Sequence, residues 1–129
     1  MIEKPCKSCG QNLPLEAFGK NYKGHLGYHS RCYRCMKDVW YREQYGVGCD
    51  YMENELRRQK SRCATCRRKF RGDPFRPPFH TGMRQVLDHD RMTGHPRGVV
   101  CVRCASMLGM IEDDVELVKS IQSYILRWA

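Results

Sequence analysis

An Asp-His pair in the C-terminal half of the chain carries the side chains best suited to catalysis. Asp88 and His89 follow a short apolar run, and a loop with Thr-Gly comes directly after them. A neutral imidazole can take a proton from water, and carboxylate oxygens are the ligands that Mg²⁺ prefers. Phosphodiester cleavage needs an activated nucleophile and a sink for the charge of the transition state. The pair therefore has side chains suited to this reaction, because Asp88 can hold a Mg²⁺ or Mn²⁺ ion and His89 can take a proton from water.

The residues around this pair predict two strands and a helix. A short strand is expected to begin at Gln85, and a return strand is expected over 97–101. A helix should begin near the Cys-x-x-Cys at 101–104 and end at about Met110. This order is a ββα-metal plan, in which two strands and one helix enclose a single divalent cation.

Eight of the nine cysteines form four Cys-x-x-Cys pairs. Each pair places two thiolates on one turn, which is half of a tetrahedral Zn²⁺ site. Paired in chain order, they predict two structural Zn²⁺ ions, one held by Cys6, Cys9, Cys32 and Cys35 and the other by Cys63, Cys66, Cys101 and Cys104. An interleaved pairing stays open. A disulfide framework is disfavoured, because the count is odd and nothing in the sequence indicates export. The ninth cysteine, Cys49, is expected to be a buried thiol.

The fold class expected is a small, zinc-stabilised α+β fold. It comprises a zinc ribbon with a linker helix over 1–46, and a ββα-metal nuclease domain with the second zinc site over 47–129. The linker helix is expected over 36–45, and glycine should end it. The next helix is expected to end near Lys60, with a capping box formed by Asp50 and Glu53.

The C-terminal helix is expected to carry the acidic run 112–114 in its first turn, where the helix dipole favours acid. Its apolar residues recur at a spacing of three to four from Val115 onward. Such a stripe packs either in a core or in a seam between two copies. This helix and the one over 50–60 could therefore form a homodimer.

The charge balance favours a nucleic-acid partner. Lys and Arg number 23 against 14 Asp and Glu, for a formal net charge of +9. The insertion over 67–84 is basic, aromatic and rich in proline. It either lies along DNA or is a solvated loop. A transmembrane helix is excluded by the lack of an 18-residue apolar run, and no signal peptide begins the chain, which predicts a reducing, cytoplasmic setting.

The segment around Asp88 resembles the phage recombination endonuclease VII family of the HNH (His-Me finger) endonucleases. The family motif reads Asp-His-Asp-His, Thr-Gly, Arg-Gly, Cys-x-x-Cys-Asn and Leu-Gly. The matching residues are Asp88, His89, Asp90, Thr93, Gly94, Arg97, Gly98, Cys101, Cys104, Leu108 and Gly109. The resemblance implies a metal-dependent DNA endonuclease in the host cytoplasm, with Asp88 as a metal ligand and His89 as the general base. Branched-DNA, nicking and site-specific modes all stay open.

Three positions of the motif leave questions open. Arg97 either clamps a phosphate as part of the catalytic site or forms a surface ion pair. Arg91 stands where the family often has a second His. Ala105 stands where the family has Asn, whose side-chain oxygen is the second protein ligand of the catalytic metal.

The loss of that oxygen has two readings. Either the natural enzyme is degenerate at position 105, or Ala105 is a deliberate inactivating substitution, and the otherwise intact motif favours the second. A non-catalytic, zinc-ribbon nucleic-acid-binding protein is the alternative that Ala105 supports. A zinc-scaffolded protein-interaction module is disfavoured by the charge and by the intact Asp-His pair.

Overall fold

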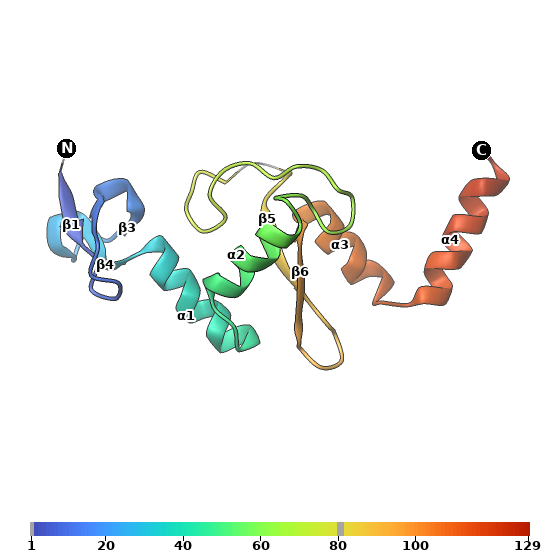
Figure 1. Cartoon of the computed structure of the whole chain (residues 1–129), viewed down its shortest axis with the longest axis horizontal. Helices are drawn as coiled ribbons and strands as arrows, with labels where there is room; N and C mark the ends of the chain where they lie inside the picture. Colours follow the sequence, from blue (N-terminus) through green and yellow to red (C-terminus); the bar gives the residue numbers. More distant parts are fainter. Residues whose placement is uncertain (1, 80–81) are drawn as a thin grey trace.

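The computed structural model describes residues 2–79 and 82–129, and it is elongated, with a small ribbon at one end and the last helix at the other (Figure 1). Its elements are a small α+β set, as the sequence predicts. None of the described helices combines the length and the hydropathy that crossing a membrane would need.

The N-terminal ribbon consists of two short antiparallel hairpins. The first pairs β1 (Glu3–Pro5) with β2 (Asn12–Pro14), and the second pairs β3 (Phe18–Lys20) with β4 (Tyr28–Cys32). Two 3₁₀ turns, η1 (Leu15–Ala17) and η2 (His25–Gly27), complete it. Its core is very small, with Phe18 and Ala17 packed against two of the cysteines. A core of this size needs a further constraint, and four converging thiols can provide one.

Helix α1 (Tyr33–Tyr45) continues directly from β4 and ends where Gly46 takes a left-handed conformation, with φ of 74°. This end agrees with the prediction, although the helix begins one turn earlier than expected. Tyr41 of α1 is buried in the second core rather than in that of the ribbon. The linker helix therefore packs with the C-terminal half.

Helix α2 (Cys49–Arg58) disproves the predicted capping box. The N-cap is Gly48, Asp50 lies inside the first turn, and no side chain of α2 caps it. Instead, Asp38 of α1 accepts a hydrogen bond from the Cys49 N–H at 2.7 Å. The cap comes from another helix, which local sequence spacing cannot reveal.

Strands β5 (Gln85–His89) and β6 (Pro96–Cys101) form an antiparallel hairpin, and α3 (Val102–Ile111) follows directly. Val86 faces Val100 and Leu87 faces Val99, and the register shifts before His89. The predicted ββα order is thus confirmed. The apolar side chains of this hairpin form one core with α2 and two phenylalanines of the insertion.

The described residues of the insertion over 67–84 form no helix, and some of its bulky side chains are internal. Phe70 and Phe75 are 5% and 3% exposed, so neither a solvated loop nor a DNA-facing segment describes them. Phe79 is half-buried. His80 and Thr81 lie outside the described residues.

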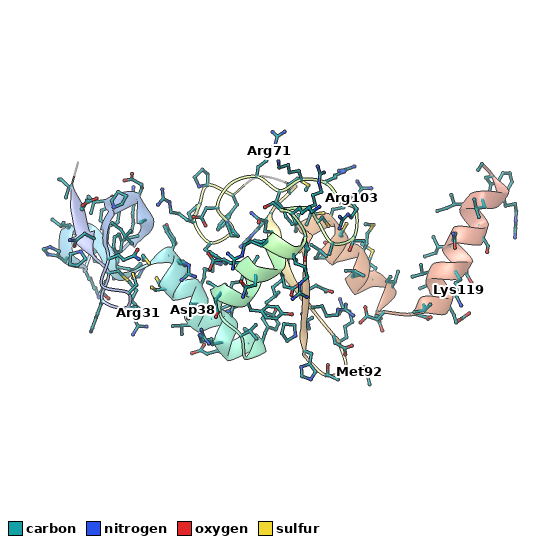
Figure 2. The ribbon with its side chains drawn as sticks, in the orientation of Figure 1. Arg31, Asp38, Arg71, Met92, Arg103 and Lys119 are labelled. Carbon is teal, nitrogen blue, oxygen red and sulfur yellow. The ribbon has the colours of Figure 1, made fainter. Side chains whose placement is uncertain are left out.

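Helix α4 (Val115–Arg127) projects from the body, and none of its residues is buried. Its side chains, including Lys119, stand apart from the rest of the protein (Figure 2). The stripe is therefore no part of the core of this chain. The expectation for the acidic run was also wrong: Glu112 and Asp113 lie before the helix with positive φ, and Asp114 is its N-cap.

Candidate active site and metal centres

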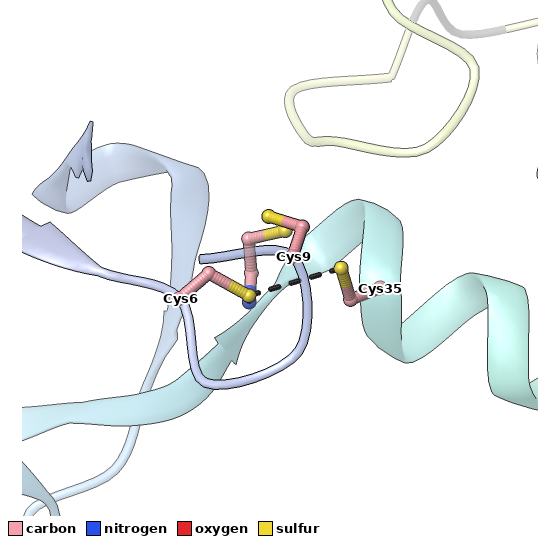
Figure 3. A group of neighbouring side chains, drawn as sticks. Cys6, Cys9 and Cys35 are labelled. Carbon is pink, nitrogen blue, oxygen red and sulfur yellow. Dashed lines mark hydrogen bonds between the residues drawn. The ribbon is translucent and has the colours of Figure 1, made fainter. Parts of the chain in front are cut away.

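Four cysteine sulfurs converge at each of the two expected zinc sites. The first group is Cys6, Cys9, Cys32 and Cys35, and the second is Cys63, Cys66, Cys101 and Cys104, with all sulfurs of a group within 4.8 Å of one another. Figure 3 shows the labelled cysteines of the first group lying close together at the start of α1. The pairing is therefore sequential and not interleaved.

The sulfur spacing fits zinc and excludes disulfides. The Sγ atoms of Cys6 and Cys35 are 3.7 Å apart, and those of Cys66 and Cys101 are 4.0 Å apart. A tetrahedron with Zn–S bonds of about 2.3 Å has edges of about 3.8 Å, whereas a disulfide bond is about 2.05 Å long. All nine thiols are free. Both groups could therefore hold a structural Zn²⁺.

Backbone amides prepare one thiol of each group for a cation. Burial alone would raise the pKa of Cys6 and of Cys63, but backbone N–H groups of their own knuckle and of the facing one lower it to about 6 in both cases. The Cys32 N–H donates to Cys6 Sγ, and the Cys101 N–H donates to Cys63 Sγ, each at 3.3 Å. A thiolate is the form that binds zinc.

The second group joins the elements around the Asp-His pair. Cys63 follows α2, whereas Cys101 ends β6 and Cys104 lies in the first turn of α3. An ion there would fix the hairpin against the helix. Cys49 takes no part in either group: it is fully buried, and burial raises its pKa to about 12.

Asp88 is held by an arginine that a third residue positions. Arg97 Nε donates to Asp88 Oδ2 at 2.7 Å, and the two terminal nitrogens of Arg97 donate to the Asp113 carboxylate at 3.1 and 3.2 Å. These hydrogen bonds to Asp88 and Asp113 raise the pKa of Arg97. Arg97 therefore forms ion pairs with two carboxylates, which agrees with the ion-pair role considered for it rather than with a phosphate clamp.

Asp113 was missed by the sequence reasoning, which placed it in the last helix. It reaches Arg97 because Glu112 and Asp113 turn the chain back, with φ of 50° and 58°, between α3 and α4. Its partner is 16 residues away, so no local pattern marks it.

His89 lies against an aromatic ring. The imidazole and the Tyr45 ring have centroids 5.1 Å apart and planes tilted by 33°. Tyr45 comes from the last turn of α1, so this contact joins helix and hairpin. A second tyrosine, Tyr51 of α2, donates to the carbonyls of Pro96 and Arg97 and holds the start of β6.

Position 105 supplies no oxygen to this site. Ala105 is half-buried against the core. The next hydroxyl, on Ser106, is exposed and donates to the Val102 carbonyl at 3.0 Å, so it is no substitute. Asp90 accepts from the N–H groups of Met92 and Thr93 and braces the loop. Of the two expected ligand positions, 88 and 105, only Asp88 has a side-chain oxygen, and this pair of residues does not fit a Mg²⁺ site as it stands.

The second departure, Arg91, reaches toward the same helix. A Cβ atom added at Gly109 would lie 2.9 Å from a terminal nitrogen of Arg91. The side chain therefore lies over α3, one turn beyond Ala105.

Comparison with known proteins gives consistent results. The family model described as recombination endonuclease VII matches residues 38–127. The Gene 59 protein of Mycobacterium phage L5 is 30% identical over 132 residues, which cover 95% of this chain and 74% of that protein. The Gene 59 protein of Mycobacterium phage D29 is 28% identical over 131 residues, with 95% and 73% covered.

One solved structure is also similar, the crystal structure of the ββα-Me type II restriction endonuclease Hpy99I. The match covers 98% of this chain and 66% of that chain, so it spans just under two thirds of the enzyme. The sequence identity is 18% and the TM-score is 0.42.

Proposed function

Because the chain belongs to the recombination endonuclease VII family, we propose that it is a DNA endonuclease whose site is built on β5, β6 and α3. The observation that carries the proposal is the position of Asp88 and His89 at the end of a hairpin that the second cysteine group joins to α3. The net charge of +9 suits a polyanionic substrate. The phage origin of the relatives supports action in the cytoplasm of an infected cell.

Each residue of the site has one proposed task. His89 takes the proton of the attacking water, and its contact with the Tyr45 ring fixes the orientation of the imidazole. Asp88 offers the carboxylate oxygen that a Mg²⁺ or Mn²⁺ ion would use. Arg97 holds Asp88 in place, because its guanidinium is itself fixed by Asp113. The two structural Zn²⁺ ions keep these elements in register.

Ala105 is proposed to impair cleavage by this chain. A bound divalent ion would stabilise the charge that develops during phosphodiester cleavage, but Mg²⁺ requires well-placed oxygen ligands. With Ala at 105, α3 contributes none. Loss of even an outer-shell partner commonly costs about 10- to 100-fold in metal affinity or activity, and a direct ligand should cost at least as much.

The lack of a side-chain oxygen at position 105 also favours one alternative, a non-catalytic DNA-binding protein. The fold and the charge would then serve binding alone, and the Asp-His pair would be a remnant. Restoring the missing oxygen separates the two functions, because a remnant site would stay inert.

The proposed experiment compares the chain with Ala105→Asn and with Ala105→Asn/His89→Ala on plasmid and branched DNA. Mg²⁺ and Mn²⁺ are tested in turn. Cleavage should appear with Asn at 105 and disappear in the double variant. Ser106→Asn is the matched control, because it adds the same amide one residue away on the exposed side of α3. Efficient cleavage by the unaltered chain would refute the role of position 105, and an inert Asn variant would support the binding protein.

We also propose a homodimer as the partner of α4. Val118, Ile121 and Ile125 lie on one face at a spacing of three to four and are 43%, 43% and 60% exposed. Contiguous apolar surface of this kind commonly marks an interface. Light scattering should report a dimer that Ile121→Glu converts to a monomer, while the exposed Gln122→Glu leaves it intact. A monomeric parent protein at high concentration would disprove this pairing.

A further inference from the structure

A hollow of about 270 Å³ lies between α1 and β5, next to the proposed catalytic histidine. Its lining includes Trp40 and Tyr45 of α1, Leu87 of β5, and two basic residues, Lys37 and Arg84. We call it the α1–β5 hollow. Its volume is just below the range of pockets that take drug-sized ligands, which is about 300–1,000 Å³. It therefore suits a single flat ring better than a larger molecule.

Trp40 gives this hollow an exposed aromatic surface. The indole is 46% exposed although it belongs to a cluster of rings. Its centroid lies 5.2 Å from that of Tyr41 and 6.0 Å from that of Tyr45, and both pairs are close to perpendicular. Tyr41 is buried, so the cluster is anchored in the core. The indole is thus supported from within while nearly half of it stays open to a ligand.

The two basic residues give the hollow a positive charge. Burial, followed by the proximity of Arg84, lowers the pKa of Lys37. Both also approach the Phe79 ring, with Lys37 Nζ at 6.0 Å and Arg84 Cζ at 4.7 Å from its centroid.

Some arginines of the protein are neutralised by an acid. Arg34, Arg42, Arg58 and Arg97 each pair with a carboxylate. Within residues 2–79 and 82–129, neither Lys37 nor Arg84 has such a partner. Two neighbouring cations without a counter-charge form a place where a phosphate is stabilised.

The Tyr45 ring connects this hollow to the end of β5, where His89 lies. Tyr45 lines the hollow and also lies 5.1 Å from the His89 imidazole. Leu87, another lining residue, precedes His89 by two positions on β5. A nucleotide stacked on Trp40 would therefore belong to a DNA strand whose backbone passes close to His89.

We propose that the α1–β5 hollow binds one unpaired nucleotide of a DNA strand, with its base stacked on Trp40 and its phosphate between Lys37 and Arg84. This inference rests on the proposed action on DNA and narrows the substrate to DNA with single-stranded or unstacked nucleotides. In an intact duplex the base faces are already occupied by neighbouring bases, so an aromatic platform gains only from a base that has left the stack. Aromatic rings and flanking cations are the two features that bind single strands without reading their sequence.

Fluorescence can test the stacking directly, because the chain has two tryptophans. Trp128→Phe leaves Trp40 as the single reporter, and Trp128 is 74% exposed on α4, so the change should not disturb the fold. A (dT)₁₂ oligonucleotide should quench Trp40. An oligonucleotide of the same length with abasic sites throughout supplies the phosphates without the bases and should leave the emission unchanged. Equal quenching by both would overturn the stacking.

Affinities measured by anisotropy provide the second test. Trp40→Ala should weaken binding of (dT)₁₂ by about 5- to 150-fold, which is the range for losing one base–aromatic stack, and should change binding of a 12-bp duplex less than 2-fold. Trp40→Phe should retain most of the affinity, and Trp128→Ala is the matched control. Lys37→Gln/Arg84→Gln should reduce the salt slope for single strands by about 0.7, because one phosphate charge would no longer be neutralised by the protein.

The outcomes separate this inference from the function on which it rests. An unchanged affinity of Trp40→Ala for (dT)₁₂, or an equal loss for the duplex, overturns the hollow as a site but leaves DNA binding intact. A protein that binds neither DNA form overturns both. Far-UV circular dichroism and zinc content confirm that each variant is folded.

Discussion

Gln59 joins α2 to the strand that ends in the second zinc knuckle, and its removal is a sharp test of how that half is held together. The side chain is 9% exposed at the end of α2. Its Nε2 donates to the carbonyls of Arg62 and Val99 at 2.7 and 2.8 Å, and its Oε1 accepts from the Val99 N–H at 2.8 Å. Val99 itself is fully buried.

The cost of Gln59→Ala follows from what each partner loses. The Val99 N–H is left without a partner in the core, which costs about 1–3 kcal/mol. The Val99 carbonyl keeps the Ala64 N–H at 3.0 Å, and Arg62 is an exposed residue, so the two donated bonds together add about 1 kcal/mol. We therefore expect the free energy of unfolding to fall by about 2–4 kcal/mol.

Urea unfolding of the zinc-loaded protein measures this loss. With a slope of about 2 kcal/mol per molar for a small domain, the midpoint should fall by about 1–2 M. Gln122→Ala makes the same chemical change on the exposed face of α4 and should stay within about 0.5 kcal/mol of the parent. Hydrogen exchange of the Val99 amide should also accelerate. A loss below about 1 kcal/mol with a protected Val99 amide would refute this account.

Three further outcomes are expected. Metal analysis should find two Zn²⁺ per chain, and a strong chelator or Cys63→Ser should unfold the C-terminal half, as circular dichroism would show; full stability without zinc would contradict this. In a cleavage-competent Ala105→Asn background, Asp113→Asn should leave the Arg97 guanidinium less firmly held. The cleavage rate should then fall about 10- to 100-fold with little change in melting temperature. An unchanged rate would show that Asp113 plays no part in the site. Asp38→Ala should lower the free energy of unfolding by about 0.5–2 kcal/mol, because α2 loses its cap, whereas Asp38→Asn should keep most of that stability. Equal unfolding midpoints of the parent and the two variants would count against the cap.

Features that depend on short sequence spacing could be predicted from the chain alone. A Cys-x-x-Cys pair folds into a turn whose two sulfurs face one point, so both zinc-binding groups were confirmed. The hairpin and α3 were also confirmed, because strand, loop and helix signals follow one another without interruption around Asp88 and His89. Gly46 ended α1 as expected, because a left-handed residue is needed there.

Features that depend on distant partners could not be predicted in this way. The cap of α2 comes from Asp38, which accepts a hydrogen bond from the Cys49 N–H eleven residues later. The predicted local capping box at Asp50 was therefore wrong. The contact of Tyr45 with His89 could not be predicted for the same reason. Phe70 and Phe75 read as surface residues because basic residues surround them, yet both fill the core.

The amino-acid sequence by itself determined which chemistry the chain can hold: eight thiols for two zinc ions, one Asp-His pair, and no oxygen at position 105. These are properties of residue type and of spacing within a turn or two. Only the tertiary structure decided that Asp113 fixes Arg97 against Asp88, that α4 stands free, and that Trp40, Lys37 and Arg84 border one hollow beside His89. Packing brings these groups together from separate elements, and the free energy that selects the arrangement belongs to the whole core rather than to any segment of the sequence.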